Sequence, residues 1–299
     1  GTVEAVRGLS FGVERGKTLG IVGESGSGKS VTAHSLLGLT NGATVSGRAV
    51  FDGHDLLRMP ENELRRIRGA RIAMIFQNPF TSLHPSHRVG YQVAEAIRIH
   101  RKAARVAARE RAVELLQSVG IPHARERAND YPHQFSGGML QRAMIAVAIA
   151  LQPDLLIADE PTTALDTTVQ AQILRLLQQL QSSLGMAMIL ITHDLSVVAG
   201  AADEVLVMYG GKVMESASNH VLYRLPHHPY TKGLMQSLPR PNAPLTPIPG
   251  RPAAAISPPT GCPFHPRCDH TIERCTSEQE LVTIGEDRSH RSACWLPVK

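Results

Sequence analysis

One stretch near the N-terminus has the residue types and spacing of a phosphate-binding loop. It reads Gly23-Glu24-Ser25-Gly26-Ser27-Gly28-Lys29-Ser30 and fits the pattern G-x-x-x-x-G-K-[ST]. Glycines let the backbone curl so that successive N–H groups point at phosphate oxygens. An apolar run precedes the loop and a helix-like segment starts at Val31, so the positive end of a helix would add to the site. The sequence predicts a nucleoside triphosphate site in which Lys29 reaches the β- and γ-phosphates and Ser30 ligates Mg²⁺.

A pair of acids ends a second apolar run. Asp159 and Glu160 directly follow the segment Leu155 to Ala158. Two negative charges at the end of a buried strand are costly unless a cation neutralises them or a reaction uses them. We expect Asp159 to hold Mg²⁺ and Glu160 to act as the general base that polarises the attacking water in phosphoryl transfer.

Elements of a parallel sheet position these residues. Five runs that are apolar on both faces predict buried strands; they span Thr18 to Val22, Arg71 to Phe76, Leu155 to Ala158, Ala187 to Thr192 and Glu204 to Met208. Helix-like segments lie between them, at Val31 to Leu37, Val89 to Arg98, Val106 to Val119, Leu140 to Leu151 and Val169 to Leu184. The alternation predicts an α/β domain with a helical insertion at about residues 88–150.

Length and composition limit the class of protein further. The chain has 299 residues, of which 42% are hydrophobic and 19% charged, as in a folded globular protein. The longest uncharged apolar run, Ala143 to Leu151, is far shorter than the roughly 18 residues that a membrane-spanning helix needs. We find no secretion signal and expect a cytoplasmic location. The net charge of +5 is too small to argue for nucleic-acid binding.

A glycine-rich segment narrows the class. It reads Phe135-Ser136-Gly137-Gly138-Met139-Leu140-Gln141 and resembles the signature motif of ABC ATPases. Ser136 can cap the following helix, and the glycines leave backbone N–H groups open to an anion. The resemblance implies an ABC-type P-loop nucleotide-binding domain whose signature residues, Ser136, Gly137, Gly138 and Gln141, contact the ATP held by a second such domain. Two domains, either identical or merely related, would then enclose two ATP molecules.

Three further residues occur in the order typical of that family. Gln77 follows the strand that ends at Phe76, Asp166 follows Ala164-Leu165 after the acid pair, and His193 follows Thr192. The resemblance implies that Gln77 senses Mg²⁺ and the attacking water, that Asp166 signals across the dimer, and that His193 contacts the γ-phosphate.

The resemblance extends to one group of importers. The stretches Gln77-Asn78-Pro79-Phe80-Thr81-Ser82-Leu83-His84-Pro85, Asp159 to Gln172 and His228-Pro229-Tyr230-Thr231 look like those of the ATP-binding subunits of oligopeptide and dipeptide importers. This implies ATP hydrolysis coupled to peptide uptake, two transmembrane permease subunits, an extracytoplasmic peptide-binding protein and a peripheral place on the cytoplasmic face of the membrane. The segment after Gln77 would receive a coupling helix of the membrane subunits.

Other functions compete with peptide import. Import of nickel or another small solute stays open. A soluble ABC ATPase acting on nucleic acid is disfavoured because the chain has no long coiled-coil insertion. A non-enzymatic iron–sulfur module is disfavoured by the intact Lys29, Asp159, Glu160 and His193.

All four cysteines, Cys262, Cys268, Cys275 and Cys294, lie in the last 38 residues. Four thiols suffice for a Cys₄ metal or iron–sulfur site, and cytosolic thiols stay reduced, which disfavours disulfides. The segment Cys262-Pro263-Phe264-His265-Pro266-Arg267-Cys268 is similar to the tail of peptide importers that hold a [4Fe–4S] cluster. We therefore expect that cluster, with Zn²⁺ as the alternative and His265, His270 and His290 as rival ligands.

Prolines mark a boundary before this tail. Eight of the 21 residues from Pro239 to Pro259 are proline, which predicts a stiff linker. We divide the chain into an ATPase domain, 1–238, and a cysteine-bearing extension, 239–299. The family's adenine-stacking aromatic residue would precede Gly1, so we expect an N-terminal truncation and name no stacking residue.

Overall fold

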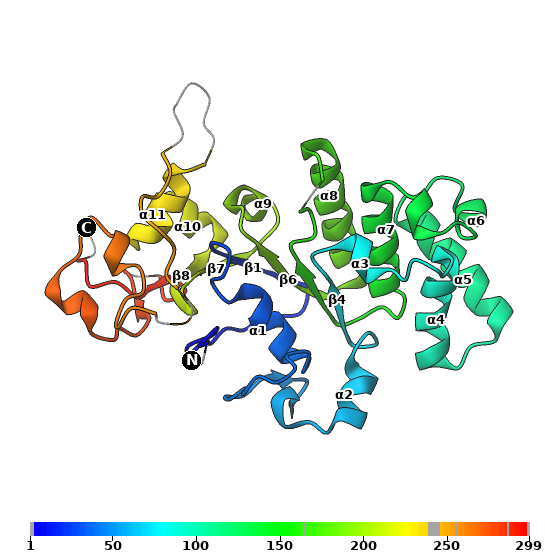
Figure 1. Ribbon diagram of the computed structural model, residues 1–299, viewed down its shortest axis with the longest axis horizontal. Coiled ribbons are helices and arrows are strands. Elements are labelled where there is room, and N and C mark those ends of the chain that lie inside the picture. The colour runs from blue at the N-terminus through cyan, green and yellow to red at the C-terminus, as the bar shows by residue number, and fades with distance from the viewer. Residues whose placement is uncertain are drawn as a thin grey trace.

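The structure, a computed structural model, describes residues 3–163, 165–238, 246–254, 256, 258–285 and 287–297. Ala164 and parts of the expected proline-rich linker lie outside this range. Figure 1 shows a central sheet with helices packed around it and the C-terminal segment at one end. In the described part of the chain, every helix is too short or too polar to cross a bilayer.

Eight strands of the described residues form one sheet in the order β4-β5-β6-β1-β7-β8-β10-β9. Their bounds are β1 Thr18–Val22, β4 Ile72–Ile75, β5 Leu155–Asp159, β6 Ala187–Thr192, β7 Glu204–Tyr209, β8 Lys212–Ser218, β9 Val282–Thr283 and β10 Arg291–Ser292. The five strands from β4 to β7 in this order are parallel, and the remaining pairs are antiparallel. A separate hairpin pairs β2, Val50–Phe51, with β3, His54–Asp55.

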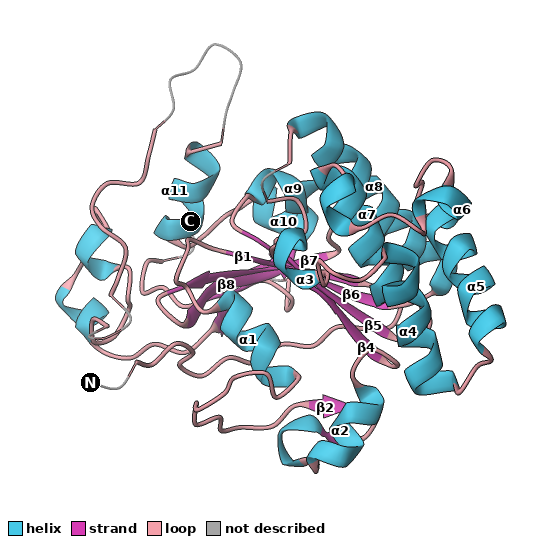
Figure 2. Cartoon of the chain, turned by 45° about the vertical axis from the view of Figure 1, so that its right-hand side comes forward, coloured by secondary structure: helices cyan, strands magenta, loops and turns pink. Residues whose placement is uncertain are grey.

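Helices cover both faces of the sheet (Figure 2). Their bounds are α1 Lys29–Leu36, α2 Glu61–Ile67, α3 Pro79–Ser82, α4 Val89–Arg101, α5 Arg105–Ser118, α6 Ala124–Arg127, α7 Gly137–Ala148, α8 Thr167–Leu184, α9 Leu195–Ala199, α10 Asn219–Arg224 and α11 Pro229–Gln236. Short 3₁₀ turns lie at Leu56–Arg58, Pro132–Gln134, His265–Arg267 and Glu273–Thr276. The helices from α4 to α7 all come from the segment between β4 and β5.

Strand residues alternate between two cores because successive side chains point to opposite faces of a sheet. In β5, Leu156 and Ala158 join the core beneath α4, α5, α7 and α8. Leu155 and Ile157 of the same strand join the opposite core, with Ala33 of α1. Both faces are therefore buried, which explains why the strands read as continuous apolar runs.

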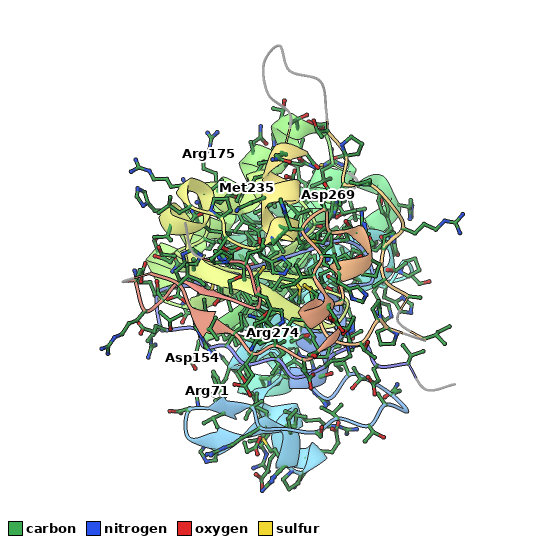
Figure 3. All side chains as sticks on the ribbon, turned by 90° about the vertical axis from the view of Figure 1, so that its left-hand side faces the viewer. Arg71, Asp154, Arg175, Met235, Asp269 and Arg274 are labelled. Carbon is green, nitrogen blue, oxygen red and sulfur yellow. The ribbon has the colours of Figure 1, made fainter. Side chains whose placement is uncertain are left out.

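A third core joins the cysteine-bearing tail to the sheet. Phe264 is 3% exposed and packs with Tyr209 of β7 and Tyr230 of α11. The tail also supplies β10, which pairs with β8 through the register Arg291 to Ser216. Figure 3 looks onto this end of the molecule, where Asp269 and Arg274 of the tail are labelled.

The α/β class and the five strands expected from the sequence are confirmed, with small shifts at their ends. The strand expected to reach Phe76 ends at Ile75, and Phe76 is 40% exposed. The helix expected from Leu140 begins at Gly137, because the Ser136 side chain accepts a hydrogen bond from the backbone of the first turn. The short elements of the tail were not foreseen, and the boundary near residue 238 stays a prediction.

Candidate functional site

Four neighbouring parallel strands bring the predicted site residues to one edge of the sheet. Parallel strands end on the same side, and ligands bind in the crevice outside their carboxyl ends. The sheet places β4, β5, β6 and β1 next to one another. Gln77 follows β4, Asp159 ends β5 and Glu160 comes directly after it. His193 follows β6, and the glycine-rich loop follows β1.

The loop has the backbone shape that its glycines predict. Gly28 has a φ of 97°, a left-handed conformation, and a Cβ there would lie 2.3 Å from the carbonyl oxygen of Ala5. Only glycine fits such a position without displacing backbone. Helix α1 begins at the next residue, Lys29, so its free N–H groups face the inside of the loop.

Lys29 places its ammonium within this curl. Its Nζ donates to the carbonyl oxygens of Gly23, at 2.7 Å, and Glu24, at 2.9 Å. Burial lowers the pKa of Lys29, although Glu160, Asp159 and Glu24 nearby oppose this shift. A cation in a glycine-rich loop at the start of a helix suits a polyanion such as a triphosphate.

Ser30 and Asp159 form the oxygen pair expected for Mg²⁺. The Ser30 hydroxyl donates to Asp159 Oδ1 at 2.9 Å. Asp159 is 2% exposed, and this burial raises the pKa of its carboxyl. His34 of α1 lies 4.0 Å from the other carboxylate oxygen. A hydroxyl and a carboxylate are hard oxygen ligands of the kind that Mg²⁺ takes, so these residues fit the ion.

Glu160 is the centre of a hydrogen-bonded group. Gln77 donates to its Oε2 at 3.0 Å and Thr163 to the same atom at 2.8 Å, while His193 Nδ1 lies 3.3 Å from Oε1. Burial alone would raise the pKa of Glu160, but the bonds from Thr163 and His193 and the charge of Lys29 outweigh it and lower the pKa. An ionised carboxylate, 8% exposed, can accept a proton from water.

The backbone at Glu160 is unusual. Its φ is 47°, in the left-handed region that side chains other than glycine rarely adopt. The N–H of Glu160 donates to the carbonyl of Ile191 on β6 at 2.8 Å, which holds the residue in place. Left-handed residues of this kind cluster at functional sites.

The segment expected to meet a second domain lies apart from the loop. Ser136 caps α7 by accepting from Met139 N at 3.4 Å. A Cβ at Gly138 would lie 2.9 Å from Val169, so α7 packs tightly against α8 there. Gln141 is 2% exposed, and its Nε2 has no hydrogen-bond partner among the described residues. In Figure 1, α7 lies among the helices on the right, away from α1.

Asp166 has a structural role in this chain. It caps α8, accepting from Val169 N at 3.0 Å. Its predicted role across a dimer remains a prediction.

Sequence reasoning missed two residues of the site. Thr163 was overlooked although it stands three residues after Glu160, close enough to turn back onto the carboxylate. His34 stands four residues after Ser30, and residues at that spacing share one face of a helix. Both spacings could have identified them.

The four cysteines line one pocket in the tail. They share it with His228, His265, His270 and Trp295. The space between these residues, including the solvent at the mouth of the pocket, is about 350 Å³. All four thiols are free. Among the described residues, no three His, Cys, Asp or Glu side chains lie close enough together to hold a single metal ion. His290 is engaged elsewhere, with its Nε2 2.7 Å from the buried Glu215.

Burial disfavours the ionised form of the thiols in this pocket. Burial, together with the neighbouring cysteines, raises the pKa of Cys262 to about 11 and raises the pKa of Cys268 and Cys294. Buried thiolates without a cation are therefore unfavourable. A bound metal centre supplies the opposing charge and deprotonates its ligands.

A loop of the phosphate-binding pattern, a hydrogen-bonded Ser–Asp pair and an ionised carboxylate at the ends of parallel strands are typical of a P-loop ATPase. The sequence model of the ABC transporter family matches residues 6–163, and that of the oligopeptide/dipeptide transporter C-terminal region matches residues 214–275. The chain belongs to the ABC transporter family, among its oligopeptide and dipeptide transport ATP-binding proteins.

Individual relatives agree with this family. The dipeptide transport ATP-binding protein DppD of Bacillus subtilis is 51% identical, over 99% of this chain and 90% of its own. The oligopeptide transport ATP-binding protein OppD of Escherichia coli is 49% identical, over 100% of this chain and 89% of its own. A solved dimer of the ATP-binding cassette MJ0796, bound to ADP and Pi, is 28% identical with a TM-score of 0.65, over 72% of this chain and 90% of its own.

Proposed function

We propose that this ATPase drives the import of oligopeptides or dipeptides through a membrane complex. The observation that carries the proposal is the group at the end of β5, where Glu160 meets Gln77, Thr163 and His193 beside the Ser30–Asp159 pair. Relatives that match nearly the whole chain are named as dipeptide and oligopeptide transport proteins. We infer the peptide cargo from these names, and we infer ATP hydrolysis from the geometry of the site.

Each residue has a chemical role in the proposed reaction. The loop from Gly23 to Ser30 and the Lys29 ammonium bind the β- and γ-phosphates. Ser30, Asp159 and Gln77 would hold Mg²⁺, which when bound neutralises charge on the phosphoryl group. Glu160 accepts the proton of the attacking water, and His193 binds the γ-phosphate.

A second nucleotide-binding domain completes the site. The signature segment of one domain would contact the ATP in the loop of the other. Support comes from the separation of α7 and α1 in one chain (Figure 1) and from the dimeric state in which MJ0796 was solved. The helices α4 to α7 would form the subdomain that carries this segment.

The loop after Gln77 is the proposed contact with the permease subunits. Asn78 caps α3 there by accepting from Phe80 N at 2.9 Å. The Phe80 ring is 61% exposed, although its edge lies 3.9 Å from the Cβ position of Gly137. A partner that covers Phe80 would therefore press on the start of α7. Such a partner would place the chain on the cytoplasmic face of the membrane, opposite a peptide-binding protein.

We further propose that Cys262, Cys268, Cys275 and Cys294 hold a [4Fe–4S] cluster; the alternative, Zn²⁺, is disfavoured because no three described His, Cys, Asp or Glu side chains lie close enough together to hold a single ion. Support comes from the pocket that the four cysteines share. Anaerobic purification followed by iron and sulfide analysis tests this. Equal amounts of iron and sulfide with brown colour are expected, and a colourless zinc-loaded protein would reject the cluster.

Reconstitution tests the transport function. The chain is purified from native membranes with its partners, and the complex is placed in liposomes. Peptide supplied with the binding protein should raise ATP turnover and accumulate inside the vesicles. Recovery of the chain without membrane partners, or stimulation by nickel and not by peptide, would contradict peptide import.

A further inference from the structure

The cysteine-bearing tail contacts the phosphate loop through one ion pair. The Arg267 guanidinium donates from Nη1 to Glu24 Oε2 at 2.9 Å and to Oε1 at 3.1 Å. The Arg267 side chain is 6% exposed and that of Glu24 is 23% exposed. Glu24 belongs to the loop that surrounds the phosphates, although 243 positions separate it from Arg267 in the sequence.

Arg267 is held rigidly on the tail side. Its Nε donates to the carbonyl oxygen of Pro249 at 2.7 Å, and its Nη2 donates to that of Ile248 at 3.1 Å. Its Nη1 also donates to the Tyr209 hydroxyl at 3.1 Å. A guanidinium with its donors occupied in this way has little freedom, so its position is fixed by the tail backbone and by Tyr209 of β7.

The proposed metal ligands bracket the residues that touch the loop. Cys262 and Cys268 stand at the two ends of the turn that contains Phe264 and Arg267. Phe264 packs against Tyr230, with ring centres 5.2 Å apart. The Tyr230 hydroxyl in turn accepts a hydrogen bond from the backbone N–H of Glu24 at 2.9 Å. The turn between the two thiols therefore holds Glu24 by its side chain and, through Tyr230, by its backbone.

Glu24 affects the site in two ways. Its carbonyl oxygen accepts a hydrogen bond from Lys29 Nζ at 2.9 Å, so the position of its backbone helps to place that ammonium. Its carboxylate is a negative charge beside a site for a triphosphate. Without Arg267 this charge would repel the phosphates, and in a partly buried site such repulsion is poorly screened.

We propose that Arg267 is a positioning residue that couples occupation of the cysteine pocket to the affinity of the phosphate loop for ATP. Arg267 holds Glu24 in place and neutralises its charge; Cys262 and Cys268 would hold the centre at the two ends of the turn that carries Arg267, and a bound centre would restrict that turn. This coupling rests on the metal centre of the proposed function. It makes the tail part of the nucleotide site.

Equilibrium binding of a fluorescent ATP analogue to the full-length, anaerobically purified chain tests the proposal. Arg267→Ala should weaken binding about 5- to 20-fold, within the range typical of coupling between sites, with iron content unchanged. Arg267→Lys should restore part of the affinity. Arg267→Gln replaces the alanine variant if that variant does not fold. The control is Arg224→Ala, because Arg224 is exposed on α10 and does not line the cysteine pocket, so the substitution should change binding less than twofold.

A double-mutant cycle separates charge neutralisation from general support of the fold. Glu24→Gln, added to Arg267→Ala, should recover most of the lost affinity because the uncompensated charge is gone. A merely structural role for Arg267 predicts no recovery. Removal of the metal from the wild-type chain by a chelator should weaken binding as Arg267→Ala does, and should have little further effect in that variant.

Defined outcomes overturn the coupling. Wild-type affinity in Arg267→Ala, or an equal loss on metal removal in the variant and the wild type, would refute it while leaving the ATPase and the metal centre in place. A chain purified anaerobically with neither iron nor zinc would instead refute the centre, and the coupling with it. A wild-type chain that binds metal but no ATP would refute the proposed nucleotide site.

Discussion

Replacing Glu160 by glutamine removes a negative charge and almost no volume. Glu160 Oε2 accepts from Gln77 at 3.0 Å and from Thr163 at 2.8 Å, and the glutamine oxygen can take this place. The glutamine nitrogen then faces His193 Nδ1, which lies 3.3 Å from Oε1 in the wild type. The substitution therefore keeps the packing and loses the basic oxygen.

The expected effect is a loss of turnover without a loss of binding. A positioned general base contributes about 10²- to 10⁴-fold to a rate, which corresponds to roughly 2.7–5.4 kcal/mol of activation free energy. We expect ATP turnover of the assembled complex to fall by this factor, measured as phosphate release. Because Lys29, Ser30 and the loop are unchanged, the dissociation constant for ATP should change by less than about threefold.

Glu63→Gln on α2 is the matched control, because Glu63 is exposed and lies outside the site. It should leave turnover at the wild-type level. Turnover of Glu160→Gln within threefold of the wild type would refute the role of Glu160 as base. A large loss of ATP affinity in the same variant would show instead that the carboxylate organises the loop.

Three further substitutions test the rest of the site. Asp159→Asn should raise the Tm of the nucleotide-free chain at pH 7 and abolish the added stability from Mg-ATP, as calorimetry would show. Burial raises the pKa of Asp159, so its ionisation costs stability as pH rises from its ordinary range through the raised pKa, and asparagine removes that cost. Gly28→Ala should destabilise the loop by about 1–3 kcal/mol and remove ATP binding, because its Cβ would meet the Ala5 carbonyl; normal nucleotide affinity would contradict this. Ser136→Asn keeps a helix cap, and Ser136→Ala does not. If Ser136 contacts ATP, both variants should lose turnover equally, and only the alanine variant should have a lower Tm. Wild-type turnover in Ser136→Asn would show that Ser136 acts only as a helix cap.

The site could be predicted from the sequence where it depends on local pattern. The β1 loop, the acids after β5, Gln77 after β4 and His193 after β6 each follow an apolar run. Any fold that sets these runs parallel and adjacent brings the residues together. The sequence pattern alone suggests parallel strands, but adjacency came from the resemblance and from the structure.

Contacts between distant segments could not be predicted. The ion pair of Arg267 with Glu24 depends on how the tail folds back along the sheet, and no periodic pattern marks it. The pairing of β10 with β8 involves two residues, too few for an alternation of polar and apolar positions. The left-handed backbone of Glu160 occurs at the point where the chain leaves β5, and no local sequence pattern marks it.

The return of the tail to the first loop has a consequence for synthesis of the protein. A ribosome releases the loop from Gly23 to Ser30 early and Arg267 only near the end of translation. On the proposed coupling, a nascent chain would meet cellular ATP with a loosely held loop and would acquire its full affinity after the cysteines had emerged. Maturation of the tail would then decide when a new subunit becomes competent to join its transporter.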